Sequence, residues 1–349
     1  MIGYKVLQTE LQKCVIDNES LLMSFKGSSF LVSGAGGLIG TYLVCLLIEA
    51  NKQLGLGMCI TAVDRNMELL KRFSDCGATI TCHGLDICTD SLPVGAYDYV
   101  IHAASNTSPV DYAQRPIDTI WTNICGAKQL MDLSIRSNSK RFLFCSSVEA
   151  YGRNNGDTDK FVESYSGYVD CNTVRAGYPA SKRCVEALCN AYAAEHACFD
   201  FVIARIGRFY GPTVIPGDTK APSQFIGNAV RGEDIILKSD GTQLFSWGYV
   251  GDCVTALLLL LKKGKKGEAY NVADPQSSRT LKDFATIAAS AGGVTIRFVE
   301  QSAVEKAGYS KITKAVLDVS KLQQLGWNAT THLEEGIPLT INYLKKETL

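Results

Sequence analysis

Phe30-Leu-Val-Ser-Gly-Ala-Gly-Gly-Leu-Ile-Gly40 is the stretch that decides the fold of this chain. A short apolar run ends in a cluster of glycines, and an apolar pattern of helical period follows. Gly34, Gly37 and Gly40 stand three apart. A G-x-G-x-x-G pattern fits less well, because its last glycine would fall on Ile39. Glycines in a strand–turn–helix unit let backbone amides approach a pyrophosphate at the positive end of the helix. The stretch therefore predicts a dinucleotide site.

A carboxylate at the end of the next predicted strand narrows the choice of cofactor. Ile60-Thr-Ala-Val-Asp64 is a second short strand that ends in an acid. Asp64 lies roughly 20 residues beyond the glycines, where an acid binds the hydroxyls of the adenosine ribose. Such a carboxylate repels a 2′-phosphate, so we expect NAD rather than NADP. Arg65 follows at once and can soften that preference.

Composition excludes several classes of function. The chain has 349 residues, with 35 basic and 35 acidic side chains and a formal net charge of zero, which argues against a polyanion partner such as nucleic acid. Hydrophobic residues make up 46% of the chain and charged residues 20%, as suits a well-buried globular enzyme. No signal peptide and no apolar run of membrane-spanning length is present, so we expect a cytoplasmic protein without a membrane partner.

The cysteines predict neither a disulfide framework nor a metal site. There are 13 of them, without a C-x-x-C spacing or a paired metal-ligand pattern. Most lie in apolar runs, as Cys45, Cys145 and Cys184 do. We expect these to be reduced residues of the core.

Strands and helices alternate along the first two thirds of the chain. Strands are predicted near 29–33, 58–63, 79–83, 98–102, 141–145 and 200–205, and the clearest helices are 117–137 and 178–195. Strands separated by helices indicate a parallel sheet with crossover connections. The predicted fold class is α/β, a Rossmann-type doubly wound parallel sheet with a smaller mixed C-terminal part.

Three regions are expected along the chain. Residues 1–28 form an N-terminal extension, partly helical, with Leu7, Leu11 and Val15 at helical spacing. Residues 29–205 form the dinucleotide-binding domain. Residues 206–349 form mostly a smaller substrate-binding part, and some of its elements return to the large domain.

Two further strand ends indicate where the cofactor lies. His102-Ala-Ala-Ser105 follows an apolar strand, and small residues there leave room for a ligand across the sheet edge. His83-Gly-Leu-Asp-Ile87 ends another such unit, and Asp86 can meet the adenine amino group. The order of these segments along the chain supports the dinucleotide interpretation.

Candidate chemistry lies in Tyr178-Pro-Ala-Ser-Lys182. A tyrosine and a lysine four residues apart on a helix share one face. A nearby ammonium favours the phenolate, so we expect Lys182 to lower the pKa of Tyr178. The phenolate can then take a proton from a substrate hydroxyl while hydride leaves the same carbon. Ser147 precedes this helix, at the end of the fifth predicted strand.

From about residue 29 to about residue 345 the chain resembles the extended short-chain dehydrogenase/reductase superfamily, in its branch of nucleotide-sugar epimerases and dehydratases. The resemblance implies that a tightly bound NAD oxidises C4 of a nucleotide-linked sugar. It implies that Tyr178, Lys182 and Ser147 are catalytic. It also implies a homodimer formed by helices 117–137 and 178–195, with Leu130, Leu133, Val185 and Leu188 among the apolar residues of these helices.

Three motifs bring the chain nearest to the UDP-glucuronate decarboxylases. Ser108-Pro-Val-Asp-Tyr112 is similar to their S-P-x-x-Y, and Arg175-Ala-Gly-Tyr178 to their R-A-C-Y. Ser147-Val-Glu-Ala-Tyr-Gly152 resembles T-S-E-V-Y-G, which puts the family's glutamate at Glu149. The resemblance implies that Glu149 removes the C5 proton next to a C4 ketone, or assists loss of a C5 carboxylate. Simple 4-epimerases of the family do not need this glutamate.

The expected site residues follow from the motifs and the resemblance together. For the cofactor they are Gly34, Gly37, Leu38, Ile39, Gly40, Asp64, Arg65, Asp86, Ile87, Ala103, Ala104, Ser105, Asn123, Tyr178, Lys182 and Arg205. For the substrate they are Ser108, Tyr112, Arg175, Arg208 and Gln224.

Several positions depart from the decarboxylase pattern. The family's arginine in G-x-Q-x-R falls on Phe245, and its arginine after Gly-Pro falls on Thr213. Arg208 stands where the family usually has asparagine. Val148 stands where the dTDP-glucose dehydratases have an aspartate, so a direct acid for the C6 hydroxyl is missing there. This redistribution of basic residues indicates a different nucleotide sugar or product.

The function expected is an NAD-dependent nucleotide-sugar enzyme that works through a 4-keto intermediate, with chemistry at C5. A decarboxylated pentose, a 4-keto-6-deoxy sugar and a C4 or C5 epimer remain open as products. A non-catalytic NAD(P)-binding regulator on the same fold is the alternative of another class, and the intact Ser147, Tyr178 and Lys182 argue against it.

Overall fold

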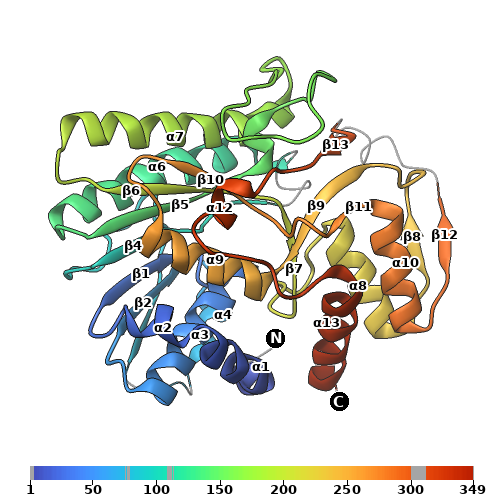
Figure 1. The fold of residues 1–349 in the computed structure, drawn as a ribbon, viewed down its shortest axis with the longest axis horizontal. Helices are drawn as coiled ribbons and strands as arrows, with labels where there is room; N and C mark the ends of the chain where they lie inside the picture. Colours follow the sequence, from blue (N-terminus) through green and yellow to red (C-terminus); the bar gives the residue numbers. More distant parts are fainter. Residues whose placement is uncertain are drawn as a thin grey trace.

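A seven-stranded parallel sheet forms the centre of the molecule (Figure 1). The computed structural model describes residues 4–74, 76, 79–107, 112, 114–299 and 312–348. The strand order is β10-β6-β5-β4-β1-β2-β3. The strands are β1 (Ser29–Ser33), β2 (Cys59–Asp64), β3 (Ile80–Gly84), β4 (Tyr99–His102), β5 (Arg141–Ser147), β6 (Phe201–Ile206) and β10 (Ala269–Val272). The first six confirm the predicted strands to within about two residues at each end, and the order is that of a doubly wound Rossmann sheet.

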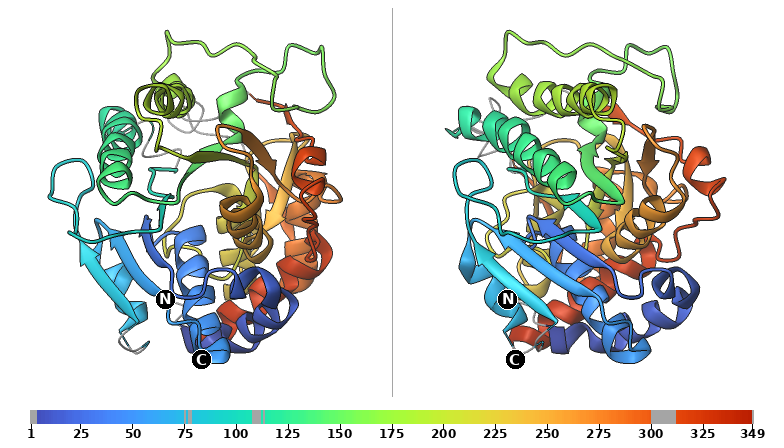
Figure 2. Two further views of the ribbon diagram at one scale, coloured as in Figure 1. Left: turned by 60° about the vertical axis from the view of Figure 1, so that its left-hand side comes forward. Right: turned by 90° about the vertical axis from the view of Figure 1, so that its left-hand side faces the viewer.

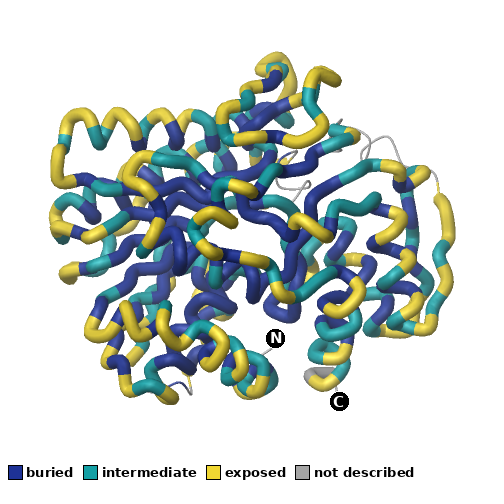
Figure 3. Tube along the Cα trace, in the orientation of Figure 1, coloured by how far each residue is buried: buried dark blue, intermediate teal, exposed yellow. Residues whose placement is uncertain are grey.

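Helices cover both faces of this sheet (Figure 2). Alternate residues of β1 show the division, because Phe30 and Val32 belong to one buried apolar cluster and Leu31 belongs to the other. One face carries α3 (Leu38–Leu54) and α9 (Val250–Lys263), and the other carries α6 (Pro116–Arg136) and α7 (Gly177–Glu195). The two long helices predicted from the sequence are therefore confirmed, and the inner strands β1, β4, β5 and β6 are almost wholly buried (Figure 3).

The C-terminal half adds a smaller mixed layer beside the large sheet. Its strands are β7 (Arg208–Tyr210), β8 (Ile235–Leu237), β9 (Leu244–Tyr249), β11 (Ser278–Thr280), β12 (Ile296–Phe298) and β13 (Lys314–Ala315). Its helices are α8 (Ala221–Arg231), α10 (Leu281–Gly292), α12 (Ser320–Gln323) and α13 (Leu333–Thr348). Strand β9 is central, since β7, β11 and β13 all pair with it. The sixth strand of the large sheet leads almost directly into β7, so this layer begins next to the carboxyl ends of the large sheet.

The N-terminal extension is helical. It contains α1 (Tyr4–Asp17) and α2 (Glu19–Met23). Outside the extension, the short helix α4 (Met67–Leu70) follows β2. Leu7, Leu11 and Val15 are fully buried, which confirms the apolar face read from their spacing. Helix α1 packs on α3 and reaches α13.

Two expectations about apolar residues are wrong. Leu130, Leu133 and Val185 are buried inside a single copy of the chain, because α6 and α7 pack against each other and against the sheet. They therefore cannot form an interface. Cys184 is exposed rather than part of the core, since it lies on the outer side of α7, whereas Cys45 and Cys145 are buried as expected. All 13 cysteines are free. In the described ranges, every helix is too short or too polar to cross a bilayer.

Candidate active site

The glycine turn between β1 and α3 is packed too closely for side chains. Gly34 has a φ of +71°, and a Cβ there would lie 2.6 Å from the backbone nitrogen of Ala104. A Cβ on Gly40 would lie 2.8 Å from the Cα of Ala35. Gly37 precedes the first residue of α3, so the amides of the first turn of α3 face the turn. The three-apart spacing thus brings a helix N-terminus and bare backbone to the carboxyl edge of the sheet, as a pyrophosphate site requires.

Asp64 lies against the same turn. Its Oδ2 accepts a hydrogen bond of 3.0 Å from the amide of Gly36, and its Oδ1 accepts one of 3.0 Å from the amide of Asn66. Gly36 was not among the predicted residues, although a Cβ there would lie 2.5 Å from Cβ of Leu69. The consecutive glycines Gly36 and Gly37 were the pattern in the sequence that could have indicated Gly36. The structure thus places a fixed carboxylate beside the turn, where it can receive ribose hydroxyls.

Arg65 is held away from that carboxylate by partners of its own. Its guanidinium donates to Oδ1 of Asn106 at 2.8 Å and to Oδ2 of Asp118 at 3.1 Å. Oδ2 of Asp118 also accepts a hydrogen bond of 3.0 Å from the side-chain Nδ2 of Asn106. A 2′-phosphate would therefore have to compete with Asp118 for Arg65, so this arginine softens the NAD preference less than its position in the sequence indicates.

The ends of β3 and β4 provide the next part of the site. Asp86 follows β3, and its Oδ1 caps the amide of Cys88 at 2.8 Å. Ile87 is buried under Gly126 of α6. Ala103 and Ala104 leave β4 next to Gly34, which agrees with small residues lying along the cofactor path.

A chain of hydrogen bonds connects the end of β4 to the helix that carries Tyr178. The Ser105 hydroxyl donates to Oδ1 of Asn123 at 2.9 Å, and Nδ2 of Asn123 donates to Ser181 at 2.9 Å. Ser181 in turn donates to the carbonyl of Tyr178 at 2.9 Å. Ser181 was not predicted, and its signal lay inside the Tyr178–Lys182 motif. This series of hydrogen bonds fixes the start of α7 relative to the cofactor path.

Tyr178 and Lys182 lie where the sequence placed them, and Nζ of Lys182 lies 5.7 Å from the centroid of the Tyr178 ring. Burial raises the pKa of Tyr178 to about 12, with a further increase from Glu149, while Ser147 and Arg175 act to lower it. Nζ of Lys182 also donates to the carbonyl of Cys145 at 2.9 Å and lies 4.7 Å from the Phe144 ring centroid. Burial lowers the pKa of Lys182 to about 8. In this geometry the ammonium binds a carbonyl of β5 beside the ring of Tyr178, while burial is the main influence on the phenol.

Glu149 is paired with an arginine from a distant part of the chain. It lies in the 3₁₀ turn Val148–Tyr151, and its amide donates to Oγ of Ser147 at 3.2 Å. Nη2 of Arg175 donates to Oε1 of Glu149 at 2.6 Å, and both side chains are largely buried. Among the described residues, Nε and Nη1 of Arg175 are buried without a hydrogen-bond partner. Within the described part of the chain, two buried donors of Arg175 therefore remain unpartnered beside Tyr178.

Tyr112 completes this group. Its ring lies 4.8 Å from the ring of Tyr178 at an angle of 31°, and the guanidinium of Arg175 lies 4.4 Å from its centroid. Tyr112, Arg175, Glu149, Ser147 and Tyr178 thus form one cluster at the carboxyl end of β5.

Other predicted residues are distributed differently. Arg205 makes an ion pair with Glu186, with Nη2 to Oε2 at 2.7 Å, and donates to the carbonyl of Glu163 at 2.7 Å. This leaves its guanidinium engaged in the scaffold, whereas a cofactor contact was expected. Gln224 is exposed on α8 and donates to the carbonyl of Thr219 at 2.8 Å. Ser108 lies outside the described residues.

Two departures from the decarboxylase pattern touch each other. The guanidinium of Arg208 lies 3.7 Å from the ring centroid of Phe245. Thr213, the third departure, is fully buried, and its hydroxyl donates to the carbonyl of Leu38 at 2.6 Å. Thr213 thereby joins the segment after β7 to the first turn of α3. Burial raises the pKa of Tyr112, and the positive charge of Arg208 acts to lower it.

Taken together, these residues fit a dinucleotide. The close approach at Gly34, the helix N-terminus after Gly37 and the fixed carboxylate of Asp64 are the features that hold a pyrophosphate and a ribose. The end of this path reaches Tyr178, where the polar cluster faces the C-terminal layer.

Comparison with known proteins agrees with this geometry. The model of the NAD dependent epimerase/dehydratase family matches residues 30–273. UDP-glucuronic acid decarboxylase 3 of Arabidopsis thaliana is 30% identical over 320 residues, which cover 88% of this chain and 86% of the relative.

Solved structures show the same fold. UDP-glucuronic acid 4-epimerase of Bacillus cereus, in complex with UDP-glucuronic acid and NAD, is 20% identical with a TM-score of 0.76, and the match covers 91% of this chain and 99% of that one. dTDP-glucose 4,6-dehydratase of Bacillus anthracis, in complex with NAD, is 20% identical with a TM-score of 0.74, and the match covers 91% and 97%.

Proposed function

The chain belongs to the NAD-dependent epimerase/dehydratase family and is therefore an NAD-dependent nucleotide-sugar enzyme, and we propose that it oxidises its sugar at C4 and then carries out a step at C5. The observation that supports this most directly is the Glu149–Arg175 ion pair beside Tyr178. A carboxylate in this place is needed for chemistry next to a ketone and is not needed for oxidation alone.

The first step is proton removal from the C4 hydroxyl. When bound, NAD supplies the acceptor for the C4 hydride and returns that hydride at the end. Tyr178 receives the hydroxyl proton, and Ser147, whose hydrogen bond lowers the pKa of Tyr178, orients the same hydroxyl. Lys182 assists once its ammonium leaves the carbonyl of Cys145, because a cation near the phenol favours the phenolate.

The second step uses the acidity of C5 next to the C4 ketone. The open Nε and Nη1 groups of Arg175 suit an anionic group on the sugar, since a planar guanidinium binds carboxylates in a bidentate way. We therefore favour a nucleotide-linked uronic acid as substrate and loss of its C5 carboxyl group as carbon dioxide. Arg175 would hold the carboxylate before it leaves as carbon dioxide, the electron pair of the broken C5–C6 bond would pass into the C4 ketone to give an enolate, and protonated Glu149 would deliver a proton to C5.

One observation favours a second candidate. Glu149 is engaged by Arg175 at 2.6 Å, and a base so engaged must be released before it can take a proton. If the pair persists with substrate bound, only the C4 oxidation and reduction remain. The enzyme would then be a C4 epimerase.

Mass spectrometry of the products separates these candidates. Purified enzyme is incubated with UDP-, dTDP-, GDP- and CDP-sugars, each as hexose and as uronic acid where available. Loss of carbon dioxide from a uronic acid is the expected result. Loss of water would indicate a dehydratase, and an unchanged mass with an altered sugar would indicate an epimerase. Binding of NAD without turnover of any sugar would support a regulatory protein instead.

We further propose a cytoplasmic homodimer that associates through the outer faces of α6 and α7. Ile117 and Trp121 of α6 are 69% and 53% exposed, which is unusual for side chains of this size. Both side chains line a hollow of about 670 Å³, together with Cys88, Cys125 and, on the adenine side of the cofactor path, Asp86. Ile117 and Trp121, in place of Leu130, Leu133 and Val185, are the apolar surface that a second copy can cover.

A further inference from the structure

Helix α1 lies outside the residues that the family model matches and carries Glu10, a half-buried acid. Oε1 of Glu10 accepts a hydrogen bond of 2.6 Å from the hydroxyl of Tyr42 and one of 2.7 Å from the hydroxyl of Tyr249. Tyr343 also interacts with this carboxylate, and burial together with Glu10 raises the pKa of Tyr343 to about 12. Burial raises the pKa of Glu10 itself, and the tyrosine hydroxyls oppose that increase.

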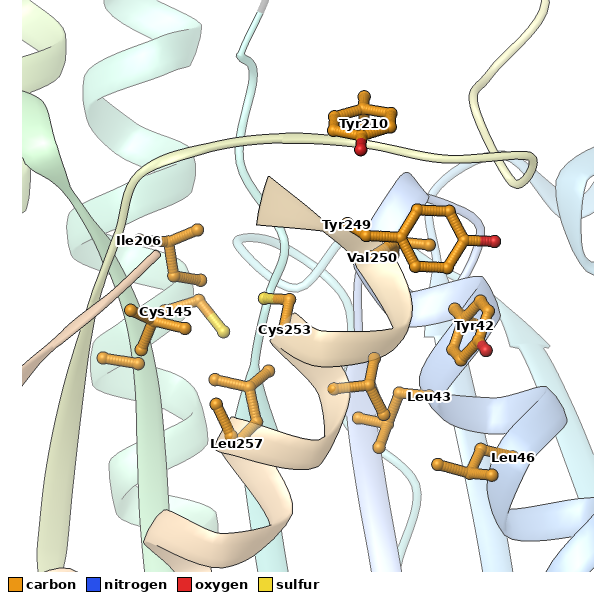
Figure 4. Close-up of a cluster of buried hydrophobic side chains, with 14 of the residues drawn as sticks. Tyr42, Leu43, Leu46, Cys145, Ile206, Tyr210, Tyr249, Val250, Cys253 and Leu257 are labelled. Carbon is orange, nitrogen blue, oxygen red and sulfur yellow. The ribbon is translucent and has the colours of Figure 1, made fainter. Parts of the chain in front are cut away.

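The donors to Glu10 come from different parts of the fold. Tyr42 belongs to α3, the helix whose first turn faces the dinucleotide path. Tyr249 is the last residue of β9, and Tyr343 belongs to α13. Figure 4 shows the rings of Tyr42 and Tyr249 near each other. Their centroids are 6.4 Å apart, in an edge-on arrangement. Glu10 therefore links the dinucleotide-binding part to the C-terminal layer.

A second contact fixes α1 on α3 alone. The hydroxyl of Tyr4 donates to the carboxylate of Glu49 in α3. Helices α1 and α3 thus exchange two tyrosine–glutamate bonds, one in each direction. The bond from Tyr249 is different, because it alone of these three comes from the C-terminal layer.

Strand β9 connects the Tyr249–Glu10 bond to residues on the substrate side. Tyr249 pairs with Tyr210 at the end of β7, and Arg208 lies in the same ladder opposite Trp247. Phe245, under the guanidinium of Arg208, also belongs to β9. A shift of β9 relative to α3 would therefore move Arg208 and Phe245 relative to the glycine turn.

We propose that Glu10 is a positioning residue, and that α1 acts as a clamp which fixes the β7–β9 layer against the dinucleotide-binding part through the Tyr249–Glu10 bond, with α1 itself held on α3 by packing and by the Tyr4–Glu49 bond. The link between this clamp and substrate binding rests on the proposed function, since Arg208 is there a substrate residue. The clamp itself rests only on the hydrogen bonds and on the packing of α1 on α3.

Two variants that each remove one hydroxyl from the same carboxylate oxygen provide the test. Tyr249→Phe removes the bond that β9 makes to Glu10, whereas Tyr42→Phe removes only a bond between α1 and α3. We expect Tyr249→Phe to speed amide hydrogen exchange in 208–210 and 244–249 about 5-fold, as loss of one hydrogen bond would. Tyr42→Phe should change exchange in these strands less than about 2-fold. Glu10→Gln, which retains one acceptor, should fall between them.

Binding provides a second readout. UDP, dTDP, GDP and CDP are titrated calorimetrically into the protein well below its Tm, and the tightest is used. Tyr249→Phe should weaken that nucleotide about 5-fold and leave NAD within about 2-fold of wild type, because α3 keeps its place. Asp17→Asn, in the exposed Lys13–Asp17 pair of the same helix, is the control and should change neither.

Equal effects of Tyr42→Phe and Tyr249→Phe on exchange, or a lowered Tm with unchanged exchange in β7 and β9, would show that α1 adds stability only and would overturn the clamp. If wild type binds none of the four nucleotides, the proposed function fails, and hydrogen exchange still decides for or against the clamp.

Discussion

The guanidinium of Arg208 lies over the ring of Phe245, with 3.7 Å between its central carbon and the ring centroid. Both residues occupy positions where the decarboxylase pattern has a different side chain. Because β7 and β9 are adjacent strands, the two departures are one local change: a cation has moved from one strand to its neighbour, and an aromatic ring now supports it.

This pair should control affinity for the nucleotide sugar. We expect Phe245→Leu to raise the KM about 10-fold with a smaller change in kcat, because a desolvated cation–π contact is worth up to roughly 2 kcal/mol. Arg208→Lys should act similarly, since an ammonium loses the planar stacking of a guanidinium. Arg231→Lys, in the exposed pair with Glu233, is the control. Steady-state kinetics with the true substrate give the answer, and an unchanged KM in both variants would remove Arg208 from the substrate site.

Glu149 and Arg175 should affect the step at C5 and spare the step at C4. Glu149→Gln should lower kcat about 100-fold or more, the usual range for loss of a general base. The 4-keto sugar should then accumulate, while exchange of the C5 proton from heavy water stops. Mass spectrometry of the quenched sugar measures both. Arg175→Lys should mainly raise the KM for a uronic acid and leave that for the matching hexose unchanged. Normal turnover by Glu149→Gln, with no exchange at C5 in either protein, would favour the C4 epimerase.

Local sequence patterns were sufficient for the scaffold of this site. The glycine turn, Asp64 and the Tyr178–Lys182 motif are each set by neighbours within a few residues, and the structure has them where the patterns indicate. The Glu149–Arg175 pair joins residues 26 apart through an irregular segment, so no periodicity predicts it. The Arg208–Phe245 contact depends on the register of β7 on β9, which is a tertiary property.

The burial of Lys182 could not be predicted from the sequence. Its partner is a backbone carbonyl, that of Cys145, and a carbonyl leaves no signal in the sequence. The raised pKa of Tyr178 follows mainly from burial. Likewise, Leu130 and Val185 have the same apolar character whether they face a neighbouring helix or a second subunit. Only the packing of α6 on α7 decides between the two.

The buried ammonium of Lys182 should make stability depend on pH. Burial lowers its pKa to about 8 in the folded protein, from 10.5 in an exposed lysine. Between these values the unfolded chain binds more protons than the folded one, so the free energy of unfolding should rise with pH in that window. Lys182→Met should abolish this rise and should gain most over wild type below pH 8. Urea unfolding of the apoprotein from pH 7 to about pH 10 tests it. Parallel curves for the two proteins would contradict the assignment.

Asp64 should select NAD over NADP. Its carboxylate is fixed by the amides of Gly36 and Asn66, so it cannot turn away from a 2′-phosphate. We expect wild-type protein to bind NAD at least about 10-fold more tightly than NADP, and Asp64→Asn to reduce that ratio, because the repulsion between close charges is removed. Asp86→Asn, on the adenine side, should weaken both dinucleotides equally. Calorimetric titration of the apoprotein gives the ratios. Tighter binding of NADP by wild type would show that Arg65 dominates despite its pairing with Asp118.

Trp121 should be part of the surface between two copies of the chain. It is 53% exposed on the outer side of α6, one turn from Ile117, and it lines the same hollow as Cys88 and Cys125. Placing a charge in a dry apolar interface costs several kcal/mol, roughly enough to shift a micromolar dimer to monomer. Trp121→Glu should therefore give a monomer by light scattering at micromolar concentration, while wild type gives a dimer. Val94→Glu, at an equally apolar but fully exposed position in the loop before β4, should leave the dimer intact. A monomeric wild type, or a dimer that survives Trp121→Glu, would exclude this face and leave the exposed tryptophan to be explained by another partner.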